Sequence, residues 1–122
     1  MSSKSDDRTT RYTSHALVEF KKNKILPFGI HSGVLLDLSL GGLKMEFTGE
    51  SQAKEGKSYW ITIPLSPLGI KAPKKFTAKI QCRWFDGDKF RLGGSFLGLQ
   101  EVDLHILQQI INKLNERGLA NL

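Results

Sequence analysis

Six consecutive residues, Asp37 to Gly42, have the residue types and the spacing most suited to binding a ligand. Their sequence is Asp-Leu-Ser-Leu-Gly-Gly, and it follows an apolar run over residues 34–36. Asp37 and Ser39 would point to the same side of an extended backbone. Gly41 and Gly42 can adopt positive φ and let a flat ligand approach the main chain. The segment predicts either a polar binding turn or a hairpin whose polar side chains bond only to local backbone amides.

Segments with the alternating pattern of β-strands lie on both sides of this turn. The most regular alternation puts one set of apolar residues on a single face: Phe76, Ala78, Ile80, Cys82 and Trp84. Asp86-Gly87 predicts a two-residue hairpin turn with positive φ at both residues, and Gly93-Gly94 predicts a bulge or a close backbone approach. We expect six strands, over residues 15–21, 32–38, 42–47, 58–65, 75–85 and 89–99. Short strands with frequent turns favour a closed antiparallel barrel or a sandwich.

The chain changes to a helical period after these strands. Apolar residues with the spacing i, i+3, i+4, i+7 predict an amphipathic helix of about four turns, and they are Leu107, Ile110, Ile111 and Leu114. Gly118 is placed to end this helix. The apolar stripe predicts a helix that plugs or flanks the barrel, with contact to a partner as the alternative. We therefore divide the chain into a polar arm (1–13), one domain of strands and helix (14–118) and a short tail (119–122).

Composition limits the class of protein. The 122 residues suffice for one modest core, and the formal charge of +6 favours anionic partners. No apolar run approaches the roughly 20 residues that span a bilayer, and the polar N-terminus lacks a secretion signal. We therefore expect a cytoplasmic protein without membrane insertion. Two lysine clusters, at residues 21–24 and 71–75, are not interleaved with aromatic residues, so nucleic acid is not the expected partner.

Residues for catalysis or metal binding do not form a recognisable pattern. The three histidines, His15, His31 and His105, lack metal-ligand spacing. Cys82 is the only cysteine, which excludes an internal disulfide and a cysteine-based zinc site, and its place in the alternation predicts a small buried side chain. The glycine pairs lack the Lys-Ser/Thr of a phosphate-binding loop. The sequence thus indicates a binding module with no cofactor or metal, and not an enzyme.

Two arginines in the polar arm, Arg8 and Arg11, complement the acidic turn chemically. The planar guanidinium group suits phosphate or the O6/N7 edge of guanine. A carboxylate such as that of Asp37 can accept hydrogen bonds from the N1–H and N2–H₂ edge of guanine. Together these groups would suit a guanine nucleotide with exposed phosphates. The alternative is that the arm arginines are simply solvated.

The chain resembles the PilZ domain family, whose hallmark is Arg-x-x-x-Arg followed by Asp/Asn-x-Ser-x-x-Gly. Residues 37–42 match the second motif in full, and residues 93–97 (Gly-Gly-Ser-Phe-Leu) are similar to the family's Gly-x-x-Phe strand. Trp84 on the preceding strand and the final helix also have the positions that are common in the family. The resemblance implies an all-β fold with one C-terminal helix: a six-stranded antiparallel barrel flanked by the amphipathic helix. It also implies binding of the bacterial second messenger cyclic di-GMP.

The resemblance assigns roles to individual residues of the turn. Asp37 would accept hydrogen bonds from guanine, and Ser39 would bond the ligand or fix the turn. Gly41 and Gly42 would allow close approach of the ligand. Trp84 would provide a stacking or wall contact, or else would be the last core residue of its strand.

The arginine motif departs from the family pattern. Arg11 fits its second arginine, but Asp7 occupies the position of the first, and Arg8 precedes Arg11 by only three residues. The resemblance implies a receptor that orders its arm on binding cyclic di-GMP and signals through an unidentified effector protein, in motility or biofilm regulation. The alternative is a degenerate PilZ-like interaction module that does not bind the nucleotide.

Overall fold

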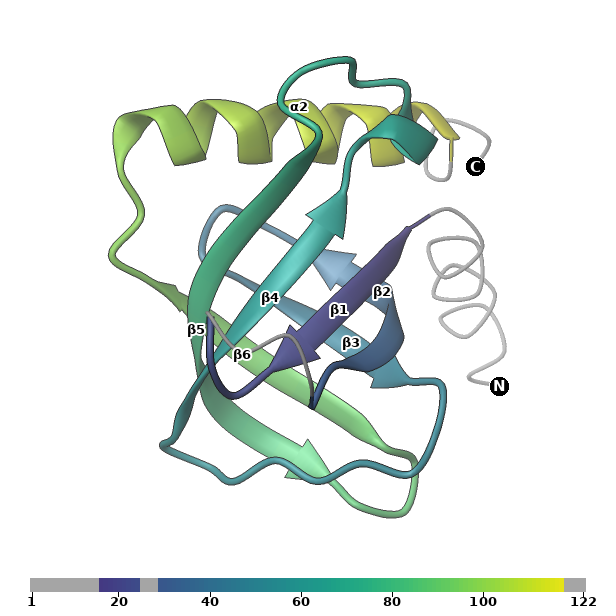
Figure 1. Cartoon of the computed structure of the whole chain (residues 1–122), viewed down its shortest axis with the longest axis vertical. Helices are drawn as coiled ribbons and strands as arrows, with labels where there is room; N and C mark the ends of the chain where they lie inside the picture. Colours follow the sequence, from purple (N-terminus) through teal and green to yellow (C-terminus); the bar gives the residue numbers. More distant parts are fainter. Residues whose placement is uncertain (1–15, 25–28, 118–122) are drawn as a thin grey trace.

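Six antiparallel strands close into a barrel in the computed structural model, which describes residues 16–24 and 29–117 (Figure 1). The strands are β1 (Leu17–Lys21), β2 (His31–Leu38), β3 (Gly42–Phe47), β4 (Ser58–Pro64), β5 (Lys75–Asp86) and β6 (Arg91–Leu97). Their order around the barrel is β1-β2-β3-β6-β5-β4, and pairing of β4 with β1 closes it. The predicted six-stranded barrel is thereby confirmed.

Alternation of apolar and polar residues explains why these segments form strands around one core. In β1 and β3 every second residue is buried, because successive side chains point to opposite faces of a strand. Burial of each large apolar side chain contributes about 1.5–3 kcal/mol. The largest fully buried side chains are Phe20, Phe76, Leu35, Met45, Ile61, Ile63, Leu65, Leu68, Ile80, Leu92, Leu107 and Ile110.

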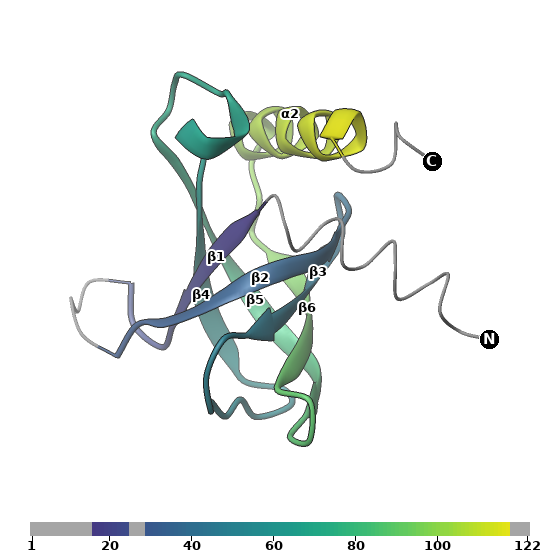
Figure 2. The ribbon, with the colours of Figure 1, turned by 90° about the vertical axis from the view of Figure 1, so that its right-hand side faces the viewer.

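The helix α2 (Glu101–Arg117) lies across one end of the barrel, next to the short helix η1 (Ser66–Leu68) (Figures 1 and 2). Leu107, Ile110 and Leu114 are buried and belong to the barrel core. The apolar stripe of the helix therefore packs against the core, as predicted, and is not left free for contact with a partner. Gly118, the predicted end of the helix, lies outside the described residues.

Aromatic side chains pack together near the C-terminal ends of β1 and β3, which lie away from α2 in Figure 1. The ring of Phe20 lies 4.6 Å from that of Tyr59 and 5.0 Å from that of Phe47, measured between centroids. Phe47 in turn lies 6.2 Å from Phe85. These distances are those of favourable aromatic pairs. The barrel is thus closed by a helix at one end and by aromatic rings towards the other.

The hairpin between β5 and β6 differs from the predicted two-residue turn. It is a four-residue turn over residues 87–90, and Phe90, not Gly87, has positive φ (54°). Asp86 Oδ1 accepts hydrogen bonds from the backbone N–H groups of Asp88 (2.9 Å) and Lys89 (3.3 Å). The aspartate side chain therefore stabilises a longer turn in place of the type I′ geometry.

Candidate functional site

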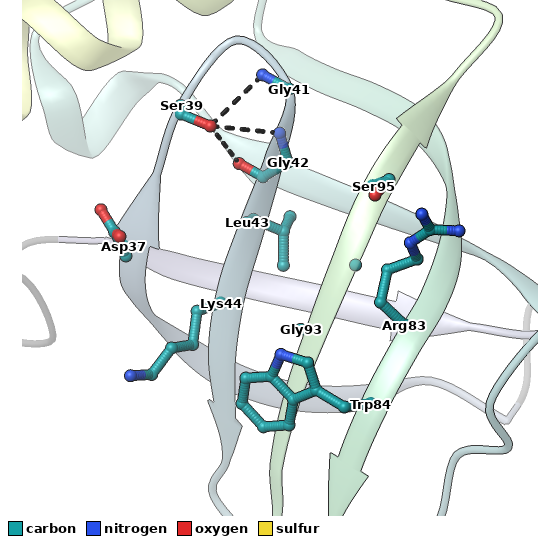
Figure 3. Close-up of a pocket in the computed structure, with 11 residues that line it drawn as sticks. Asp37, Ser39, Gly41, Gly42, Leu43, Lys44, Arg83, Trp84, Gly93 and Ser95 are labelled. Atoms are coloured by element: carbon teal, nitrogen blue, oxygen red, sulfur yellow. Dashed lines mark hydrogen bonds between the residues drawn. The ribbon is translucent and has the colours of Figure 1, made fainter.

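An open cavity of about 460 Å³ lies on the barrel surface where β2, β3, β5 and β6 are neighbours (Figure 3). Five of the seven residues that the sequence analysis assigned to ligand binding line it: Asp37, Ser39, Gly41, Gly42 and Trp84. The remaining lining residues are Leu43, Lys44, Arg83, Gly93, Gly94 and Ser95. The fold therefore brings the turn between β2 and β3 together with Trp84 of β5. Arg8 and Arg11 lie outside the described residues.

Ser39 organises the turn at the rim of this cavity. Its Oγ accepts hydrogen bonds from the backbone N–H groups of Gly41 and Gly42, both at 3.3 Å. The same hydroxyl donates to the carbonyl oxygen of Gly42 at 3.4 Å (Figure 3). The backbone N–H of Ser39 donates to the same carbonyl at 2.9 Å. The local hydrogen bonds of the hairpin interpretation are thus present. Ser39 fixes the turn, and Asp37 lies beside it at the end of β2.

A β-bulge in β2 places Asp37 on the surface, where it lines the cavity. Leu35 is paired with Met45 and Asp37 with Lys44, so the register shifts by one residue at Leu36. Leu35 is fully buried, whereas Asp37 is exposed. In a regular strand the two residues would share a face, because side chains repeat every two residues. The extra residue of the bulge therefore moves the carboxylate from the core side to the surface. Asp37 Oδ1 also accepts the backbone N–H of Leu38 at 2.9 Å.

A second bulge, in β5, does the same for Trp84. Cys82 is paired with Gly94 and Trp84 with Gly93, which leaves Arg83 as the extra residue. Cys82 is buried, but 39% of Trp84 is exposed, and Phe85 packs against the core in its place. The predicted alternation that put Trp84 on the core face is therefore wrong beyond Cys82. The interpretation of Trp84 as the last core residue is also wrong, because the indole lines the cavity.

The glycines of the cavity have packing reasons of their own. A Cβ at Gly93 would overlap the indole of Trp84, so the ring can pack on β6 only because this residue has no side chain. A Cβ at Gly42 would collide with the carbonyl oxygen of Gly94 on β6. Gly41 and Gly42 can adopt positive φ but do not use it here. The turn closes through hydrogen bonds to Ser39 Oγ with negative φ at both glycines. At Gly41 a Cβ would meet only Ser39 Oγ, at 3.9 Å.

The cavity has two cationic side chains that the sequence did not predict there. Lys44 on β3 and Arg83 on β5 both line it, and Ser95 on β6 adds a hydroxyl group (Figure 3). Arg83 Nη1 donates to Gln81 Oε1 at 3.2 Å, which holds the guanidinium over the sheet. Asp37 and Lys44 form no ion pair in the described part of the chain. The cavity thus offers a carboxylate acceptor, two cations and an indole ring around one space.

Cys82 lies beneath the β5 bulge and has the buried position predicted for it. Only 1% of the residue is exposed, and its Sγ lies 3.5 Å from the carbonyl oxygen of Trp84. Burial raises the pKa of the thiol, and the negative charge of Glu55 raises it further. A neutral thiol is a poor nucleophile and a poor metal ligand. Among the described residues no group of three His, Cys, Asp or Glu side chains could hold a metal ion.

Comparison with known proteins supports this architecture. The family model of the PilZ domain matches residues 5–113. No curated protein matches the chain. The similar solved structures include the PilZ domain with c-di-GMP of YcgR from Escherichia coli, which has a TM-score of 0.59 and 22% sequence identity over 83% of this chain and 82% of that chain.

Two further solved structures are similar at lower identity. The PilZ domain of CeSA from a cellulose-synthesizing bacterium has a TM-score of 0.58 and 14% identity over 82% of this chain and 92% of that chain. The Bacillus subtilis inhibitor of motility (MotI/DgrA) has a TM-score of 0.58 and 13% identity over 84% of this chain. This chain covers 47% of the length of that protein. At these identities the structural likeness shows the fold.

Proposed function

We propose that this chain, which belongs to the PilZ domain family, is a cyclic di-GMP receptor that signals through a partner protein. The observation that carries the proposal is that Asp37, Arg83 and Trp84 line the same surface cavity (Figure 3). These side chains come from different strands, and two bulges are needed to bring them there. The similar PilZ domain of YcgR was solved with c-di-GMP. No helix among the described residues is long and apolar enough to cross a membrane.

The chemistry of the cavity fits a guanine nucleotide with phosphate groups. The Asp37 carboxylate can accept two hydrogen bonds from the N1–H and N2–H₂ edge of guanine. Arg83 and Lys44 supply positive charge for phosphate, and the fork of Arg83 suits bidentate contact. Trp84 presents an exposed ring on which a base can stack. The cations of the barrel therefore contribute phosphate contacts in addition to those expected from the arm.

The signal would pass through the N-terminal arm. Arg8 and Arg11 precede β1 in the sequence, and the resemblance assigns them to the ligand. We propose that they close over the bound nucleotide and order residues 1–13, which changes the surface offered to the partner. Such an order–disorder change converts a binding event into a new protein surface. Cytoplasmic location and a role in motility or biofilm regulation belong to the same proposal.

Calorimetric titration with cyclic di-GMP tests the binding site. We expect binding by the wild-type protein and a loss of roughly tenfold to a hundredfold in affinity for Asp37→Ala, because a charge-assisted hydrogen bond contributes about 1.5–3 kcal/mol. Arg83→Ala and Arg11→Ala should weaken binding by similar factors. Asp88→Ala removes an exposed carboxylate from the β5–β6 turn and should bind as the wild type does. Equal binding of GTP, or full affinity in Asp37→Ala, would contradict the proposed site.

The altered arginine motif favours a second function, that of a PilZ-like interaction module that does not bind the nucleotide. Asp7 stands where the family has its first arginine, and it would place negative charge near a dianionic ligand. If no heat is released up to about a millimolar ligand, the affinity is too low for a second-messenger receptor. The chain would then act as a degenerate PilZ interaction module. Asp7→Arg, which restores the motif spacing to Arg11, should recover binding in that case.

A further inference from the structure

We propose that a second surface of the barrel binds a short acidic segment of a partner protein through one apolar anchor residue and flanking carboxylates. This lysine–tryptophan surface consists of Lys24, Trp60, Lys79 and Leu97, from the segment after β1 and from β4, β5 and β6. It is separate from the cavity of Asp37 and Trp84. The proposal does not depend on nucleotide binding.

The register of the strands places this surface in one continuous row. Lys21 is paired with Trp60, Trp60 with Lys79, and Lys79 with Leu97. Neighbours on opposite sides of Trp60 along β4, Tyr59 and Ile61, are buried, so Trp60 points outwards. Paired residues of adjacent strands lie on the same face of a sheet. The row therefore presents an aromatic ring between cationic side chains, with an apolar residue at its end.

The two lysines are held at the ring. Lys24 Nζ lies 4.9 Å from the centroid of the Trp60 ring, and Lys79 Nζ lies 5.9 Å from it. Cation–π attraction restrains both flexible side chains, so less conformational entropy is lost when a carboxylate binds them. Neither lysine forms an ion pair among the described residues. Both ammonium groups are therefore available to an anionic partner.

A cavity between the strands and α2 gives the anchor residue its place. It has a volume of about 420 Å³, and Trp60, Leu97 and Leu99 are among its lining residues. The exposed fraction of Leu97 is 37%, which is high for a leucine with apolar neighbours. A leucine-sized side chain placed between Trp60 and Leu97 would be removed from water on both sides, which favours binding. Asp103 of α2 also lines the cavity. Its negative charge repels carboxylates and limits how far the acidic segment extends towards α2.

The basic character continues in the other direction along β4. Ser58 and Trp60 are two residues apart on the same strand, and Ser58 lines an adjacent cavity of about 610 Å³. Three lysines line this second cavity: Lys22, Lys54 and Lys57. In the part of the chain that the structure describes, no acidic residue lines this second cavity, and Asp103 is the one acidic residue that lines the first. Lysines outnumber carboxylates along this path, so a run of acidic residues can follow it.

The geometry favours a protein segment over single-stranded nucleic acid. Nucleic-acid platforms stack successive bases on several aromatic rings, whereas this surface has one ring with two ammonium groups already over it. The described strands form a closed barrel, so no strand edge is left for backbone pairing with a peptide. Recognition must then use side chains: carboxylates at the lysines and one apolar residue at the cavity.

Fluorescence anisotropy with a labelled synthetic peptide tests the proposal. The probe has one leucine flanked on both sides by glutamates, and it is titrated with protein in the absence of any nucleotide. We expect saturable binding that weakens about tenfold in Lys79→Glu, because an attractive charge pair becomes a repulsive one. Trp60→Ala should weaken it by more than tenfold, as aromatic anchors dominate such interfaces. Lys89→Glu, a matched charge reversal on the β5–β6 turn, should leave binding unchanged.

Two further probes decide the class of partner. A peptide with serine in place of leucine should bind about tenfold more weakly, because it lacks the apolar anchor. An oligothymidylate of similar charge should not compete with the acidic peptide. Competition by the oligothymidylate, equal loss in Lys89→Glu and Lys79→Glu, or indifference to the leucine would overturn the proposal. Because nucleotide is absent from these titrations, their result is independent of the proposed receptor function.

Discussion

The two tryptophans of this barrel lie in contrasting surroundings. Trp60 belongs to β4, whose pairings with β1 and β5 run in register without interruption. Trp84 follows the bulge in β5 and rests on Gly93 at the side of a cavity. The uninterrupted pairings of β4 place Lys21 and Lys79 on either side of Trp60, whereas the bulges in β2 and β5 bring an aspartate, an arginine and an indole to the lining of one cavity. The regular register produces an extended charged surface, and the irregular register produces a concave site.

The difference shows how a barrel acquires a binding site without losing its core. Both bulges precede a residue that lines the cavity, Asp37 in β2 and Trp84 in β5. On each strand the buried residue before the bulge keeps its place, and the residue after it moves to the surface. Bulges are common next to functional sites because they redirect single side chains. The cost in ladder hydrogen bonds is confined to one position on each strand.

The largest expected effect is a difference in unfolding free energy between substitutions at the two glycines of the β2–β3 turn. Gly42→Ala should lower the free energy of unfolding by about 3 kcal/mol, because its Cβ would collide with the carbonyl oxygen of Gly94 across the β3–β6 pair. Gly41→Ala, where the nearest atom is Ser39 Oγ at 3.9 Å, should change it by less than about 1 kcal/mol. Urea denaturation measures both. An equal loss of unfolding free energy in both variants would mean that the β2–β3 turn tolerates a side chain at neither glycine.

A smaller effect tests whether packing on Gly93 fixes the position of Trp84. Gly93→Ala should displace the indole and lower the unfolding free energy by about 2 kcal/mol, with a clear change in the fluorescence of Trp84. Gly87→Ala is the matched control, since its Cβ would lie 3.7 Å from the Phe85 ring, an ordinary contact. If Gly93→Ala left both stability and fluorescence unchanged, Trp84 would not be fixed by packing on β6. The cavity would then lack a defined wall.

The smallest expected effect concerns Cys82 beneath the β5 bulge. Its pKa is raised above the ordinary 9.0 by burial and by Glu55. The thiol therefore ionises first in the unfolded chain, so its contribution to stability is complete below about pH 9 and is lost as the pH rises towards the folded pKa. Relative to Cys82→Ala, the wild type should lose up to about 1 kcal/mol of unfolding free energy per pH unit above 9. A constant difference from pH 7 to 10 would show that the thiol is accessible to solvent.

Much of the fold could be predicted from the sequence because the barrel is built from regular alternation. All six strands and the final helix lie close to their predicted ranges, and Leu107, Ile110 and Leu114 pack as their spacing indicated. The polar turn at residues 37–42 was also recognisable, since its Asp-x-Ser-x-x-Gly pattern combines turn chemistry with an exposed carboxylate. These features depend on local sequence alone.

The missing parts of the site depend on register, which alternation does not reveal. The apolar pattern of β5 continues without a break through Trp84, so nothing in it indicated that Arg83 is an extra residue. Gly93-Gly94 was the available signal, because these glycines face the bulge on the partner strand. Lys44 was missed because only strand pairing places it opposite Asp37. Arg83 was missed because only the β5 bulge brings it to the cavity. The cation–π contacts of Trp60 were missed for the same reason, as Lys24 and Lys79 are distant in sequence.

An NMR titration of ¹⁵N-labelled protein with cyclic di-GMP tests the central proposal most directly. The chain contains two tryptophans, so the indole N–H signals of Trp84 and Trp60 report on the cavity and on the lysine–tryptophan surface in one experiment. We predict that the Trp84 signal and the backbone amides of Ser39 and Gly41 shift, while the Trp60 signal stays in place. Shifts centred on Trp60, or none at either ring up to about a millimolar nucleotide, would contradict the proposed receptor site.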